Sequence, residues 1–115
     1  MSTYDLLLTG GHLIDPSQKI NGKNDVGFKD ERVVEVSGKL DHALAEKVYT
    51  ISDKIITPGL VDLHTHIYWG GIEPKDYARR CGTNTTLDAG TAGAGNFAGF
   101  REHIIKPTRP RVLAC

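Results

Sequence analysis

Short apolar runs, each closed by glycine, proline or acidic residues, follow one another through the first half of the chain. These runs have the length and turn spacing of β-strands, and they predict about six strands before residue 58. They are residues 4–9, 12–14, 26–28, 32–36, 48–51 and 54–56. The pair around Asp30-Glu31 predicts a hairpin, and residues 41–47 predict one or two helical turns. We expect a small β-sandwich, or part of one.

After Pro58-Gly59 the pattern changes to strands that alternate with helices. Residues 60–66, 83–89 and 111–115 predict strands, and residues 74–81 predict a helix with proline near its start and Gly82 just past its end. A second helix is expected after Asn96, a good N-cap, and ends before Pro107. This β-α-β-α-β order predicts an α/β fold with a parallel sheet and right-handed crossovers. Because the third strand coincides with the chain end, we expect a fragment of a longer gene product.

Charge and composition narrow the range of partners. The chain has 14 basic and 14 acidic residues, so we expect neither nucleic acid nor a membrane surface as partner, since both require clustered basic residues. Its apolar runs are far shorter than the ~20 residues that span a bilayer, and we see no signal peptide. Cys81 and Cys115 lack CxxC spacing and fit a reducing compartment. We expect a cytoplasmic protein with a small-molecule substrate, and a homo-oligomer is left open.

The candidate site lies where the strand at residues 60–66 ends in His-Thr-His. Alternation along a strand places Asp62, His64 and His66 on one face. Two imidazoles in this arrangement can bind one metal ion at ~2.0–2.1 Å each. The carboxyl end of a strand is also where α/β barrels build their active sites. We therefore predict His64 and His66 as metal ligands, with Asp62 behind them as an acceptor that orients a histidine. Two surface histidines at a strand end are the alternative.

The stretch Pro58-Gly59-Leu60-Val61-Asp62-Leu63-His64-Thr65-His66 resembles the opening signature of the amidohydrolase superfamily, which includes dihydroorotases, hydantoinases and many deacetylases. Residues 68–71 and 88–100 resemble its dihydroorotase-like amidohydrolase/deacetylase subgroup. The resemblance implies a (β/α)₈ TIM barrel preceded by a small β-sandwich domain. Residues 1–57 would be the N-terminal part of that β domain. Residues 58–115 would be the first β/α units of the barrel.

The same resemblance implies an activity. His64 and His66 would bind the more buried ion of a centre with one or two divalent metals, most often Zn²⁺. A metal-bound hydroxide would cleave a C–N bond in a cyclic amide or N-acyl compound, or a small acetyl ester. The family's bridging lysine, further histidines and acid/base aspartate come from later strands, so no catalytic residue is assigned within these 115 residues. We expect this piece alone to be inactive.

Residues near the histidines are candidates for substrate contact. Tyr68 and Trp69 follow the histidine pair directly, and they could line the pocket or pack the loop against the barrel rim. In the glycine-rich loop, Gly93, Gly95 and Asn96 could offer main-chain N–H groups and a helix N-terminus to a carboxylate or carbonyl oxygen. A turn kept small for packing is the alternative for that loop. Asp88 is expected to be a structural hydrogen-bond acceptor.

Two other functions compete with the enzyme. Residues 93–98 match G-x-G-x-x-A between a strand and a helix, which is a dinucleotide-binding pattern. The interval of residues 90–92 makes the turn longer than that pattern requires, which argues against it. The second competitor is a non-catalytic, dihydroorotase-like structural or assembly partner. The intact His-Thr-His favours the enzyme.

Overall fold

The computed structural model describes residues 2–68 and 71–115. It divides into two compact units, Met1–Pro58 and Gly59–Cys115, which together contain strands and helices in a mixed α/β arrangement. Among the described residues, no helix combines the length and the apolar character needed to cross a membrane.

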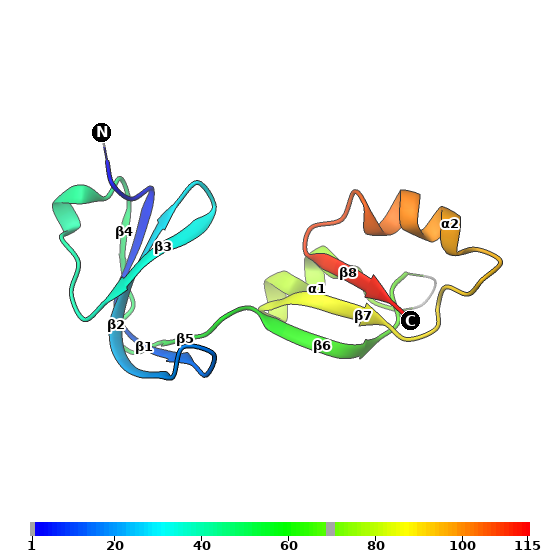
Figure 1. Ribbon diagram of the computed structural model, residues 1–115, viewed down its shortest axis with the longest axis horizontal. Coiled ribbons are helices and arrows are strands. Elements are labelled where there is room, and N and C mark those ends of the chain that lie inside the picture. The colour runs from blue at the N-terminus through cyan, green and yellow to red at the C-terminus, as the bar shows by residue number, and fades with distance from the viewer. Residues whose placement is uncertain (1, 69–70) are drawn as a thin grey trace. The chain divides into compact units, whose positions relative to one another are not determined.

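The first unit is built on one mixed sheet (Figure 1). Its strands are β1 (Leu6–Asp15), β2 (Ile20–Lys29), β3 (Arg32–Ser37), β4 (Val48–Thr50) and β5 (Ile55–Ile56). The order is β3-β2-β1-β4. Strand β5 also pairs with β1, at residues that follow the part of β1 paired with β4. Antiparallel pairing of β2 with β3 confirms the predicted hairpin. The predicted helical turn is a 3₁₀ helix over His42–Leu44. The strands described here form a single sheet and supply no second layer of a sandwich.

A bulge explains why the sequence predicts two strands where the structure has β1 alone. The register with β2 shifts between Leu8 and Gly11, and Gly10 has a φ of 74°, which glycine adopts without strain. The Gly10 N–H donates to the buried Asp25 at 2.8 Å, and the other oxygen of that carboxylate accepts from Leu40 N–H at 2.9 Å. The glycine pair therefore bends one strand and does not end it.

The second unit alternates strands and helices as predicted. Strands β6 (Leu60–Thr65), β7 (Thr83–Asp88) and β8 (Arg111–Ala114) form a parallel sheet in chain order. Helix α1 (Pro74–Cys81) lies between β6 and β7, and α2 (Phe97–Phe100) leads into a π-helical turn, Arg101–Ile105, before β8. Figure 1 shows the three arrows side by side and pointing the same way. The carboxyl ends of all three strands therefore lie along one edge of the sheet.

The helix ends follow local chemistry. Glu73 caps α1 by accepting from Asp76 N–H at 2.9 Å, and Pro74 occupies the first turn. Gly82, with a φ of 69°, ends the helix and confirms the predicted stop. Asn96 precedes α2 as predicted, but its side chain makes no capping bond. Its Oδ1 instead accepts from Gly93 N–H at 2.7 Å and closes the glycine-rich turn.

The core of this unit joins the chain segments that follow β6 and β7. Ile67, Ala92, Phe100 and Val112 are buried together, with Tyr68 and Ile72 packed against them. Ile67 comes directly after the histidine pair, and Ala92 lies in the loop after β7. Their burial in one cluster fixes the two segments that carry the candidate site.

Candidate metal centre

The two histidines lie together at the carboxyl end of β6. His64 is in the strand and His66 follows it, and both are solvent-exposed. Their ring centroids are 5.6 Å apart, with the ring planes at 81°. Both line a hollow of about 320 Å³, whose walls also include Asp62, Thr65, Gly71, Ile72 and Tyr77. The structure thus brings together the three residues that the sequence places on one face, Asp62, His64 and His66.

Asp62 holds the strand beneath the histidines. One carboxylate oxygen accepts from the main-chain N–H of His64 at 3.0 Å, and the other accepts from the Tyr77 hydroxyl at 2.8 Å. These bonds, the main-chain one foremost, lower the pKa of Asp62, so the carboxylate stays ionised near neutrality. The hydrogen bond between Asp62 and the Tyr77 hydroxyl also raises the pKa of Tyr77. Asp62 therefore reaches the backbone of His64 and not its ring, which differs from the role the sequence indicates.

Thr91, in the loop after β7, contacts the ring of His66. Its Nδ1 lies 3.3 Å from the Thr91 hydroxyl oxygen. Thr91 is held in turn by Asp88, which is fully buried and accepts from the main-chain N–H groups of Thr91 at 2.9 Å and Ala92 at 3.1 Å. The second oxygen of Asp88 accepts from Ile67 N–H at 3.0 Å. Asp88 is the structural acceptor that its position at the strand end predicts.

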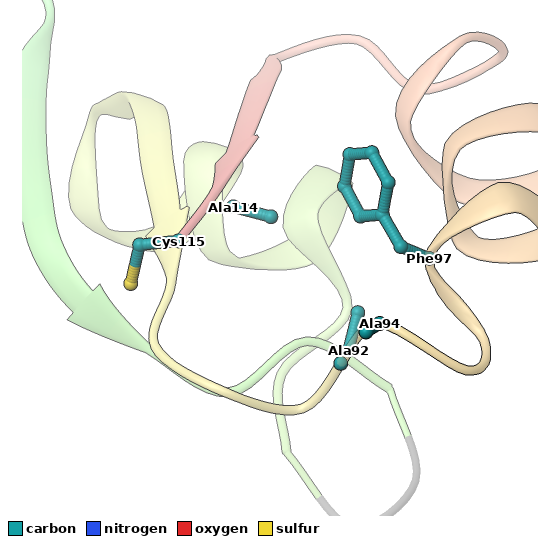
Figure 2. A pocket seen from close by; sticks show the side chains of 6 residues that line it. Ala92, Ala94, Phe97, Ala114 and Cys115 are labelled. Carbon is teal, nitrogen blue, oxygen red and sulfur yellow. The ribbon is translucent and has the colours of Figure 1, made fainter.

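Of the remaining predicted contacts, those among the described residues do not line the histidine hollow. Tyr68 has a φ of 58°, packs against the core cluster and donates its hydroxyl to Glu73 at 3.2 Å. Trp69 lies outside the described residues. Gly93 lines a separate hollow of about 350 Å³ (Figure 2). Gly95 and Asn96 line a third, of about 430 Å³.

Figure 2 shows why the Gly93 hollow has little polar chemistry. The Phe97 ring and the methyl groups of Ala92, Ala94 and Ala114 surround it, and the Cys115 sulfur points away. The Gly93 N–H is already taken by Asn96 Oδ1 at 2.7 Å. A ligand can use that N–H only once this bond opens. Helix α2 is also just four residues long, so it has little dipole to offer an anion.

Known proteins of similar sequence and structure are hydrolases. No protein-family model matches the chain. A deacetylase of Agrobacterium fabrum is 51% identical over 63 residues, which cover 51% of this chain and 16% of the deacetylase. A dihydroorotase crystal structure matches with a TM-score of 0.81 and 33% identity, and the match covers 95% of this chain and 30% of that one. The chain belongs to the amidohydrolase superfamily. Its relatives place it with the dihydroorotase-like amidohydrolases and deacetylases.

A third relative was solved with zinc bound. The N-acyl-D-glutamate deacylase of Bordetella bronchiseptica, solved with zinc and a phosphonate inhibitor, has a TM-score of 0.60 and 26% identity over 74% of this chain and 18% of its own. The present chain spans 16–20% of the length of its curated deacetylase and dihydroorotase relatives.

The side chains of this amidohydrolase chain include ligands that zinc prefers, but fewer of them than a catalytic zinc needs. His64 and His66 line the same hollow, and imidazole is a ligand that zinc prefers. Among the described residues, however, no group of three or more His, Cys, Asp and Glu side chains is placed to hold a metal. A catalytic zinc takes about three protein ligands, so the histidine pair fits part of a centre.

Sequence reasoning missed two residues of this site, Tyr77 and Thr91. Tyr77 lies on α1 and reaches back to Asp62, and Thr91 reaches His66 across the sheet edge. Neither contact has a local signature, because each depends on how a helix or a loop folds over β6. The one usable signal is position, since both residues lie in segments that directly follow strands β6 and β7.

Proposed function

We propose that the protein containing this chain is a metal-dependent hydrolase, and that His64 and His66 are two of its zinc ligands. Its substrates are a cyclic amide or N-acyl compound, cleaved at a C–N bond, or a small acetyl ester. The observation that carries this proposal is the pair of imidazoles on one hollow at the carboxyl end of a parallel strand. The deacetylase and dihydroorotase relatives support the substrate classes.

The proposal extends to the architecture. We assign residues 1–57 to the N-terminal part of a small β-sandwich domain and residues 58–115 to the first β/α units of a TIM barrel. The parallel order β6-β7-β8 and the dihydroorotase neighbour support this assignment. In such a barrel the active site is built from loops at the carboxyl ends of the strands.

Three residues of the chain have a defined part in the proposed centre. His64 and His66 hold the ion, and Asp62 fixes the main chain at His64 through its bond to His64 N–H. When bound, a divalent ion supplies a Lewis acid that polarises a carbonyl group and lowers the pKa of a water molecule. The remaining ligands and the group that moves the proton are assigned to parts of the protein outside this chain.

The test is hydrolysis by the complete protein with and without its metal. Purified protein is assayed against N-acetyl amino acids, five- and six-membered cyclic amides and an aryl acetyl ester. We expect turnover of at least one class, a loss of about 100-fold or more after chelation, and recovery when zinc is added back. The His64→Ala variant should not recover. Absence of turnover with zinc bound would favour a non-catalytic partner, and turnover unaffected by chelation would refute the metal mechanism.

A further inference from the structure

We infer that Thr91 and Asp88 are positioning residues for His66, and that they leave its Nε2 as the atom that binds the metal. This inference rests on the proposed function, because it concerns the same histidine. Both residues come from the segment after β7, whereas the histidines come from β6. The proposal therefore gives the second strand and its loop a direct part in the site.

Thr91 contacts the imidazole ring of His66. His66 Nδ1 lies 3.3 Å from Thr91 Oγ1. A neutral imidazole carries a proton on one nitrogen and a lone pair on the other, and a partner on one nitrogen decides which is which. The Thr91 side chain is itself hydrogen-bonded to the Asp88 carboxylate, which only accepts, so the hydroxyl proton is used there and the Thr91 oxygen accepts Nδ1–H of His66. The lone pair then remains on Nε2. Metal-binding histidines commonly use their second nitrogen in this way, and the partner fixes both tautomer and ring orientation.

Asp88 holds the loop that carries Thr91. Asp88 accepts from Thr91 N–H and Ala92 N–H with one oxygen and from Ile67 N–H with the other. Ile67 is the residue after His66. One buried carboxylate therefore holds both the backbone next to His66 and the backbone of the residue that contacts its ring. A further main-chain bond, from Ala89 N–H to Thr65 O at 2.8 Å, ties the same two segments together.

The two segments that carry His66 and Thr91 are each anchored by a buried residue. Ile67 is 0% exposed and Ala92 is 5% exposed, and both belong to the core cluster of this unit. The segments that carry His66 and Thr91 are thus packed on their inner sides and hydrogen-bonded between them. The ring is presented from a fixed backbone to an open hollow, which is the arrangement that a preorganised ligand requires.

The experiment measures zinc affinity of the complete protein by competition with a chromophoric chelator. Thr91→Val removes the hydroxyl at nearly constant volume, and Thr91→Ser keeps it. Thr86→Val is the matched control, because the buried Thr86 hydroxyl has no hydrogen-bond partner among the described residues. We expect Thr91→Val to weaken zinc binding by about 10–100-fold, Thr91→Ser to stay within about threefold of the parent, and Thr86→Val to match it. Thermal midpoints of the metal-free proteins check that each variant is folded.

Ring-nitrogen NMR of the zinc-loaded parent protein provides a readout that needs no variant. Coordination of His66 through Nε2 supports the inference, and coordination through Nδ1 overturns it. Unchanged affinity in Thr91→Val also overturns it. In that case, loss of zinc in His66→Ala shows that the proposed function stands without this positioning role. Zinc bound as tightly by His64→Ala and His66→Ala as by the parent would overturn both.

Discussion

At the scale of single residues, two carboxylates organise the site through main-chain N–H groups. Asp62 accepts from His64, and Asp88 accepts from Ile67, Thr91 and Ala92. Burial opposes the ionisation of Asp88, but the main-chain N–H donors and the Thr91 side chain outweigh it and lower the pKa of Asp88 below the ordinary value of 3.8. A carboxylate with a lowered pKa contributes stability above its ordinary pKa. That stability is lost as the pH falls through the lower, folded-state value.

We predict that Asp88→Asn destabilises the protein and flattens this acid dependence. An amide group can accept with one atom only, so at least one buried N–H group loses its partner, at a cost of about 1–3 kcal/mol. Denaturant unfolding at pH 7 should show that loss. The difference between parent and variant should shrink as the pH is lowered below 3.8. An unchanged unfolding free energy at pH 7 would contradict the role given to Asp88.

Tyr77 gives a second prediction at this scale. Tyr77→Phe removes the hydroxyl that donates to Asp62 at 2.8 Å, so the pKa of Asp62 should rise towards its ordinary value. A carboxyl-carbon NMR titration measures this shift directly. Tyr4→Phe is the control, since Tyr4 donates to Glu35 at 2.5 Å in the other unit and should leave Asp62 unaffected. Equal titration of Asp62 in parent and Tyr77→Phe would show that the bond does not form in solution.

The sequence predicts a site residue well when its partner is close in the sequence. His64 and His66 are two residues apart on one strand, so alternation alone places them together. Thr91 contacts His66 and Tyr77 contacts Asp62 from segments 25 and 15 residues away along the chain. Those contacts follow from tertiary packing, and no pattern within a short window contains them.

At the scale of elements, prediction succeeded where turn chemistry is explicit. Proline at the start of α1 and Gly82 at its end fixed that helix to its observed bounds. It was less accurate at β1, where Gly10 makes a bulge within a strand. It also missed the change from α2 to a π-helical turn, Arg101–Ile105. At Gly10 the pattern predicts the end of a strand, but the strand continues. After Phe100 it predicts regular helix, but the chain continues as a π-helical turn.

We predict that Gly82→Ala lowers stability by about 1–2 kcal/mol, because an alanine must adopt the left-handed conformation that ends α1. No atom lies within 4 Å of an added Cβ there, so backbone strain is the whole effect. Gly99→Ala, also in open space but within α2, is the control. It should be neutral or stabilising by up to about 1 kcal/mol. Equal effects of the two substitutions on the thermal midpoint would contradict this explanation.

At the scale of the whole molecule, the chain supplies a scaffold and part of the proposed site. The second unit orders three parallel strands so that their carboxyl ends lie together, with the histidine pair at one of them. The described residues provide two imidazoles and no third ligand group. Relatives of this chain are much longer, and the match covers 16–20% of the curated ones. The proposed catalytic centre therefore depends on segments that this chain does not contain.

The most direct test of the central claim is the metal content of the purified complete protein. Elemental analysis of the parent, His64→Ala, His66→Ala and the double variant would be compared at equal protein concentration. We expect at least about one equivalent of zinc or another divalent transition metal in the parent, and a large loss in each variant, since each removes one of few ligands. Circular dichroism should show that the variants remain folded. Metal at background level in the parent, or unchanged content in the double variant, would contradict the assignment of His64 and His66 as ligands.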